Sequence, residues 1–282
     1  MAVAILTDST SDIDPALAAR YGIDVIPLFV NFGDERFRDG IDLSRGEFYR
    51  RMREGRLLPT TSQPTSAMFE AAYRPHVEAG RAIVSVHITR GLSGTINAAQ
   101  AAAAQFPGAE IRLVDSLTVT GGCALLALHA AELARAGESA GAILDALERD
   151  RTVQHGYCTL PDLSHAVRTG RVGKTQAALG SLLRIVPVLR VGDGEVDVEA
   201  RVRTFSRAQA TIVDATVRDL GEVAKSRLLV MHAHAPASGE ALLERLRSKL
   251  TAKPAYFALA EAGPAIATHA GEGAVGIFSI AG

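Results

Sequence analysis

The sequence predicts an α/β protein of two domains, an N-terminal three-layer domain on a parallel sheet and a C-terminal α+β domain. In residues 1–155, short apolar runs alternate with helical patterns of about 10–15 residues, which is typical of βαβ units. In residues 156–282, strand-like runs follow each other closely, and Gly192-Asp193-Gly194 is a hairpin signal, so an antiparallel component is expected. The length of 282 residues also corresponds to about two domains.

The N-terminal elements alternate between strand and helix. Short apolar runs predict strands at residues 3–7, 25–28, 82–87 and 111–115. Periodic segments with capping residues predict helices at 15–21, 44–52, 61–80, 93–106, 120–136 and 139–149. Ser44 and Glu47 have capping-box spacing, and Pro64 suits a first helical turn. Residues 31–38 are expected to form a polar hairpin or loop around Gly33 and Asp34.

The C-terminal elements have a different rhythm. Strands are expected at residues 153–159, 185–191, 195–202, 228–232, 255–260, 265–268 and 274–280. Helices are expected at 161–169, 206–220 and 238–250. The change of rhythm places the domain boundary at residue 155.

Composition excludes several classes of function. The chain has 30 Lys and Arg against 31 Asp and Glu, a net charge of −1, which argues against a protein that coats nucleic acid or an anionic membrane. Cys123 and Cys158 have no zinc-site spacing, so no metal is expected, and both fit a reducing compartment. The first residues lack the basic region of a signal peptide, and no apolar run approaches the ~20 residues of a membrane span. A cytoplasmic location is expected.

Four polar segments follow strands or open helices, where open parallel sheets bind ligands. Residues 7–12, Thr-Asp-Ser-Thr-Ser-Asp, read as a turn and N-cap cluster. Residues 60–64 form either a cap or an anion site at a helix start. Residues 91–95 and 170–175 are the other two.

Residues 91–95, Gly-Leu-Ser-Gly-Thr, resemble a nucleophile elbow, but Thr95 stands where that motif needs glycine. A serine hydrolase that uses Ser93 and His269, with Asp115 as the third member, is therefore the alternative function. His269 follows a predicted strand and precedes glycines, which leaves it free to face a cleft. His232 and His234 are interpreted as structural.

Residues 170–175 are close to a phosphate-binding loop, but Arg168 replaces the required first glycine and a helix is predicted before it. ATP binding here is rejected, and a stand-alone kinase is disfavoured with it. Arg171, in a turn flanked by glycines, can instead present a cation to an anion or a partner.

These segments, in this order, resemble the DegV family. The matching stretches are Thr7-Asp8-Ser9-Thr10, Val25-Ile26-Pro27-Leu28, Thr61-Ser62-Gln63-Pro64, Leu92-Ser93-Gly94-Thr95, Val114-Asp115-Ser116, Gly170-Arg171-Val172, Leu182-Leu183-Arg184-Ile185-Val186-Pro187 and His269-Ala270-Gly271-Glu272-Gly273-Ala274. The resemblance spans essentially the whole chain. It departs from the family at residues 89–91, Thr-Arg-Gly, where serines are frequent, and at Glu272, where proline is frequent.

The resemblance implies a bacterial, FakB-like carrier that is not itself an enzyme and has no cofactor. It would bind one long-chain fatty acid between its domains and present it to a separate ATP-binding fatty acid kinase subunit. That subunit would form an acyl phosphate for phospholipid synthesis, with at most transient membrane contact by the carrier. The resemblance places the fatty-acid carboxylate at Thr61, Ser62, Ser93, Gly94, Thr95 and His269. Arg171 would contact the head group or the partner.

Overall fold

The structure, a computed structural model, describes residues 2–55, 58–171 and 185–282. Its N-terminal sheet has the strand order β2-β1-β6-β7, and all neighbours in it are parallel. These strands are β1 (Val3–Asp8), β2 (Ile23–Ile26), β6 (Ala82–His87) and β7 (Ile111–Asp115). The helices around them are α1 (Pro15–Tyr21), α3 (Ser66–Glu78), α4 (Thr95–Ala103), α5 (Gly121–Arg135) and α6 (Ala140–Thr152). A short 3-10 helix, η1 (Ser9–Ser11), follows β1.

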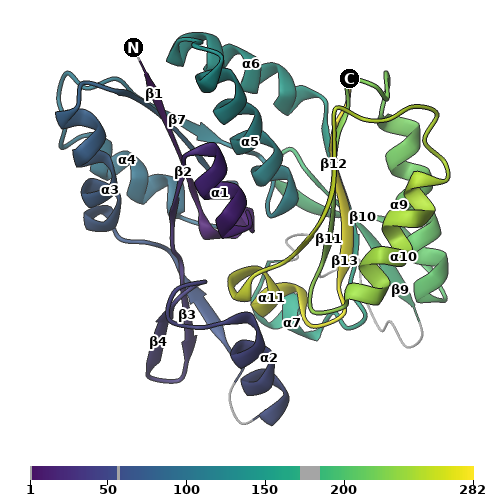
Figure 1. Cartoon of the computed structure of the whole chain (residues 1–282). Coiled ribbons are helices and arrows are strands. Elements are labelled where there is room, and N and C mark those ends of the chain that lie inside the picture. Colours follow the sequence, from purple (N-terminus) through teal and green to yellow (C-terminus); the bar gives the residue numbers. More distant parts are fainter. Residues whose placement is uncertain (1, 56–57, 172–184) are drawn as a thin grey trace.

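Helices cover both faces of the N-terminal sheet, which gives three layers (Figure 1). Neighbouring residues of β1 point to opposite faces. Ile5 belongs to a core with α5 and α6, whereas Leu6 belongs to a core with α3 and α4. Such double-sided burial explains why the strand reads as a continuous apolar run rather than an alternating one.

The C-terminal sheet has six strands in the order β10-β9-β8-β13-β11-β12. Only the pair β11–β12 is parallel among its described neighbours. The strands are β8 (Gln154–Thr159), β9 (Val186–Gly192), β10 (Glu195–Val202), β11 (Arg227–His232), β12 (Tyr256–Glu261) and β13 (Val275–Ile280). Helices α9 (Phe205–Asp219) and α10 (Pro236–Arg247) cover one face. The opposite face looks toward α5, with α7 (Ser164–Arg168) and α11 (Pro264–Ala270) at one end (Figure 1).

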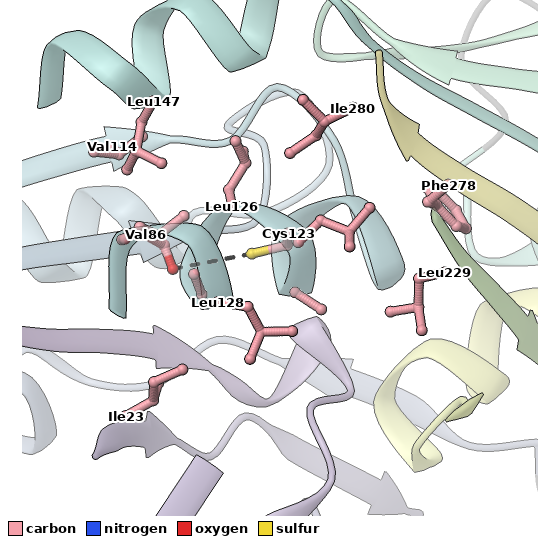
Figure 2. Packing of buried hydrophobic residues seen from close by; sticks show 14 of the residues in the cluster. Ile23, Val86, Val114, Cys123, Leu126, Leu128, Leu147, Leu229, Phe278 and Ile280 are labelled. Atoms are coloured by element: carbon pink, nitrogen blue, oxygen red, sulfur yellow. Dashed lines mark hydrogen bonds between the residues drawn. The ribbon is translucent and has the colours of Figure 1, made fainter. Parts of the chain in front are cut away.

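Helix α5 lies between the two sheets and packs on both (Figure 1). Figure 2 shows this core, in which Cys123 points toward the carbonyl of Val86, with a sulfur–oxygen distance of 4.0 Å. Burial raises the pKa of the Cys123 thiol far above its usual range, so this cysteine behaves as a small apolar side chain.

A small antiparallel sheet, β4-β3-β5, projects below the N-terminal sheet together with α2 (Figure 1). Its elements are β3 (Phe29–Phe32), β4 (Glu35–Arg38), β5 (Thr60–Ser62) and α2 (Arg45–Glu54). The core of this unit includes Ala265 and Ala267 of α11. The small sheet therefore holds α11, although the two are far apart in sequence.

The predicted fold class is confirmed: a parallel α/β part precedes a mixed α+β part. One predicted element is wrong. Residues 265–268, expected as a strand, belong to helix α11. The alternation Ala-Ile-Ala-Thr suggested a strand, but Pro264 stands at the first helical position, where its missing N–H costs nothing.

The helix predicted from residue 61 begins later, because α3 starts at Ser66 with Thr65 as its N-cap. Residues 60–62 instead form β5, which pairs with β3. Proline biases the preceding residue toward extended backbone, so Pro64 keeps the chain out of a helix at Gln63. The helix start expected at residue 61 is therefore wrong, whereas an anion-binding role for residues 60–64 stays a prediction.

Candidate functional site

A cavity of about 530 Å³ lies between the C-terminal sheet and the loops that follow the N-terminal strands. One end is polar. Thr61 bonds to His269, Arg171 acts on the same histidine, and Gln63 approaches Gly94 beside Ser93, so these residues and Ser62 form this polar end. The other polar lining residues are Thr10, Arg90, Thr120 and His232. The rest is mostly apolar and includes Leu28, Ile88, Leu92, Val119, Leu160, Leu189, Val191, Val196, Met231, Ile266 and Phe278. The volume and this polarity fit a small amphiphile with one polar end.

Thr61 and His269 form a hydrogen-bonded pair at the polar end, with 2.8 Å between Oγ1 and Nε2. Nδ1 of His269 is buried and has no partner among the residues that the structure describes. If the Thr61 hydroxyl donates to Nε2, Nδ1 carries a free N–H. If Nε2–H donates instead, the hydroxyl proton is free. In either tautomer one donor of the pair has no partner among the described residues.

His269 is neutral near pH 7. Burial lowers its pKa to about 4, and the nearby Arg171 and His165 add to the shift because their charge disfavours a second cation. Positive charge near the cavity therefore comes from two lining arginines, Arg171 and Arg90, of which Arg90 also lies 4.0 Å from the Asp115 carboxylate.

The depressed pKa of His269 makes stability depend on pH. Its pKa is about 4 when folded, against an ordinary value of 6.5, so the unfolded chain takes up a proton first as pH falls. Stability contributed by the neutral form is complete above about pH 6.5 and is lost toward pH 4, by about 3 kcal/mol. We expect urea unfolding to show this extra loss in the wild type and not in His269→Gln. Equal pH slopes in the two proteins would contradict the assignment.

Ser93 and Gly94 form the second polar group, at the start of α4. The Ser93 hydroxyl lies 2.8 Å from Oγ1 of Thr95 and accepts the Thr95 backbone N–H at 3.3 Å. Thr95 is buried and is not among the cavity-lining residues, so it positions Ser93. A Cβ at Gly94 would lie 2.0 Å from Oε1 of Gln63, so this glycine allows the amide to approach. The positive end of α4 faces the same region and favours a negative charge there.

Buried carboxylates hold the start of α11 and thereby position His269. Asp12 accepts the backbone N–H of Gly263 at 2.7 Å and the Thr120 hydroxyl at 2.6 Å. Asp12 has a left-handed backbone with φ of 56°, which aspartate tolerates better than most residues. Burial raises the pKa of Asp12 well above its usual range and that of neighbouring Asp39 to about 6.

Six of the residues that the resemblance implied line this cavity: Thr61, Ser62, Ser93, Gly94, Arg171 and His269. Thr95 does not line the cavity but hydrogen-bonds to Ser93, which does. Sequence reasoning missed the lining residues Thr10, Gln63, Cys158 and His232. Thr10 and Gln63 stand inside quoted motifs, which was an available signal. Cys158 and His232 gave none, because their exposure to the cavity depends on strand register.

The geometry gives no support to a serine hydrolase. Within the described residues, His269 bonds to Thr61, Ser93 bonds to Thr95, and Asp115 accepts backbone N–H groups of Arg90 and Leu117.

A hydrogen-bonded Ser-His-Asp series does occur elsewhere: Nδ1 of His87 lies 3.0 Å from the Asp8 carboxylate, and its Nε2 lies 2.7 Å from the Ser85 hydroxyl. All three side chains are fully buried, so no substrate reaches them.

Parts of two motifs quoted from the sequence lie outside the described residues. Residues 172–175 of the loop rejected as an ATP site lie outside the described residues, as do 182–184 of another quoted motif.

In the described ranges, no three His, Cys, Asp or Glu side chains are grouped so that they could hold a metal ion. None of the helices that the structure describes is long and apolar enough to cross a membrane.

Comparisons with known proteins agree with one another. The family model described as "Uncharacterised protein, DegV family" matches residues 2–282. A DegV domain-containing protein of Deinococcus radiodurans is 37% identical over 280 residues, which are 98% of each chain. A solved structure described as "Fatty Acid Binding of a DegV family Protein from Thermus thermophilus" has a TM-score of 0.94 and 32% identity over 100% of both chains.

A second solved structure, of a stearic acid-binding protein from Eubacterium ventriosum, has a TM-score of 0.92 and 25% identity. The match covers 98% of this chain and 97% of that one. The family match extends over residues 2–282, and the two structural matches cover 100% and 98% of the chain. The chain therefore belongs to the DegV family.

Proposed function

We propose that this protein binds one long-chain fatty acid, with its tail in the apolar part of the cavity and its carboxylate at Thr61, Ser93 and His269. The observation that carries the proposal is a single cavity with a hydrogen-bonding end and an apolar remainder. Solved relatives of the same fold are described as fatty-acid binding, which supports the same ligand class here.

The tail and the carboxylate of the fatty acid contribute differently to the binding free energy. Burial of about 14 methylenes at roughly 0.8 kcal/mol each contributes on the order of 10 kcal/mol. The tail therefore dominates affinity. The hydroxyls, the imidazole and the nearby Arg90 and Arg171 orient the carboxylate, because each offers a donor or a positive charge.

The head-group role makes a testable prediction. Thr61→Ala and Ser93→Ala each remove one hydroxyl donor, so each should weaken fatty-acid binding about fivefold, or about 1 kcal/mol. Displacement of a fluorescent fatty acid measures the change. Thr211→Ala is the matched control, since Thr211 lies on α9 and bonds to its own helix at Arg207. Unchanged affinity in both cavity variants would contradict the head-group assignment.

We further propose that the protein presents its ligand to a separate ATP-binding kinase subunit, which phosphorylates the carboxylate. Arg171 is exposed and also lines the cavity, so it can touch both the head group and a partner. With a cognate kinase, Arg171→Ala should reduce acyl phosphate formation more than fatty-acid binding. Equal reductions would confine Arg171 to the head group.

Mass spectrometry of the purified protein, native and after organic extraction, tests the fatty-acid proposal itself. A stoichiometric fatty acid is expected. A protein that carries none and refuses added fatty acid overturns the proposal. Labelling of Ser93 by a fluorophosphonate, lost in Ser93→Ala, would favour the hydrolase instead.

We also propose residues 1–155 and 156–282 as the two domains, with the acyl chain between them. The two large sheets support a division in this region: β8 begins at Gln154 and belongs to the C-terminal sheet, so the change of sheet falls just before the proposed boundary.

A further inference from the structure

The cavity runs along β13, away from its polar end. The chain leaves α11 just after His269 and turns through Gly271 and Gly273 into β13. Within this described segment Ala274, Val275, Gly276 and Phe278 line the cavity. Ile280, two residues further along the same face, does not line it and belongs to the apolar core. Phe278 is therefore the last residue of β13 that the cavity reaches.

Rows of paired residues across the C-terminal sheet show that the cavity ends at the same position. In the row that contains Gly276, the four central neighbours Leu189, Cys158, Gly276 and Met231 all line the cavity. In the next row, Val191 and Phe278 line it, whereas Gly156 and Leu229 do not. In the row after that, the described residues Gln154, Ile280 and Arg227 all lie outside the lining. The cavity ends at the row of Phe278.

Two glycines on different elements make room for the Phe278 ring. A Cβ at Gly156 of β8 would lie 2.7 Å from Cε1 of the ring, and a Cβ at Gly121 of α5 would lie 2.9 Å from Cδ2. The ring thus spans the gap between the sheet and the start of α5, and Phe278 is only 2% exposed. Figure 2 shows Phe278 and Leu229 beside α5 in this part of the core. An aromatic side chain held from two sides is a rigid wall.

We propose that Phe278 sets the longest acyl chain that the protein accepts, by closing the distal end of the tail cavity. This inference rests on the proposed function, in which the cavity holds a fatty-acid tail. The terminal methyl of the preferred ligand contacts the ring. A longer chain must displace the ring against Gly156 and Gly121, or leave methylenes in water and forgo about fourfold in affinity for each.

The test measures dissociation constants of saturated fatty acids from dodecanoate to icosanoate for the wild type, Phe278→Ala and Leu229→Ala. The wild type should show an affinity maximum followed by a fall. Phe278→Ala should move the maximum to longer chains, gaining about fourfold for each methylene that enters the vacated space. Leu229→Ala is the matched control, since Leu229 is a buried neighbour of Phe278 in the same row and does not itself line the cavity. It should lower the melting temperature and keep the maximum in place.

The outcomes separate the two proposals. An unchanged maximum in Phe278→Ala, or the same shift in Leu229→Ala, overturns the role of Phe278 while fatty-acid binding stands. Absence of binding by the wild type overturns the proposed function, and this inference with it. If Phe278→Ala does not fold, Phe278→Leu retains an apolar side chain and should still shift the maximum in the same direction. No shift there overturns the proposal.

Discussion

Replacement of Asp8 by alanine should lower the free energy of unfolding by about 4 kcal/mol, because it removes a fully buried acceptor from a network of donors. One carboxylate oxygen accepts the backbone N–H of Thr10 at 3.0 Å and also its hydroxyl. The other accepts the backbone N–H of Ile88 at 3.1 Å and lies 3.0 Å from Nδ1 of His87. Alanine leaves all of these groups buried without a partner.

The consequences of Asp8→Ala reach the cavity, because Thr10 lines it and Ile88 lines it too. We expect weaker fatty-acid binding together with the lower stability. Urea denaturation followed by circular dichroism measures the stability change. Asp145→Ala is the matched control, since Asp145 is exposed on α6, and surface substitutions of this kind usually stay within about 0.5 kcal/mol. A loss no larger than that of the control would refute the network as a source of stability.

Replacement of Gly91 by alanine should lower stability by about 2 kcal/mol through overpacking. A Cβ at this position would lie 2.2 Å from the carbonyl oxygen of Gly194, at the tip of the β9–β10 hairpin. Because this neighbour is backbone, it cannot rotate away. Gly194 is also fixed there by its N–H, which donates to the carbonyl of Leu117 at 2.9 Å.

The same substitution should weaken fatty-acid binding by about tenfold, because the hairpin must move away from Gly91. That displacement withdraws Val191 and Val196 from the cavity wall on one side and shifts Ser93 on the other. Gly46→Ala provides the contrast. Nothing lies within 4 Å of a Cβ there, and Gly46 is inside α2, so alanine should stabilise by about 0.5–1 kcal/mol. If Gly91→Ala unfolds at the wild-type urea concentration, the close approach to Gly194 is wrong.

Local signals in the sequence predicted most elements, because caps and turns depend on neighbouring residues. Ser44 accepts the backbone N–H of Glu47 at 3.2 Å, as its spacing predicts. The reciprocal half of the capping box is replaced, since the Glu47 carboxylate bonds to Arg50 and Arg51. Both arginines lie within four residues of Glu47, so this detail depends on competition between neighbouring side chains, which the capping-box spacing alone does not describe.

Elements with distant partners were predicted less well. β5 is extended because β3 pairs with it, and α11 is held by Asp12 and the small sheet. The polar end of the cavity was located through the family resemblance rather than through spacing. The ring of Phe278 between Gly121 and Gly156 depends on strand register and on a helix docking against a sheet. No local pattern encodes either one.

The pairing of Thr61 with His269 joins positions 208 residues apart, and that of Asp12 with Gly263 joins positions 251 apart. During synthesis on a ribosome, residues 1–155 emerge long before α11 and β13 exist. A nascent chain therefore has neither the imidazole nor the far wall of the cavity until almost all of these residues have been translated. Under the proposed function, we therefore expect lipid loading to follow translation, and we expect a chain truncated before α11 to retain no fatty acid.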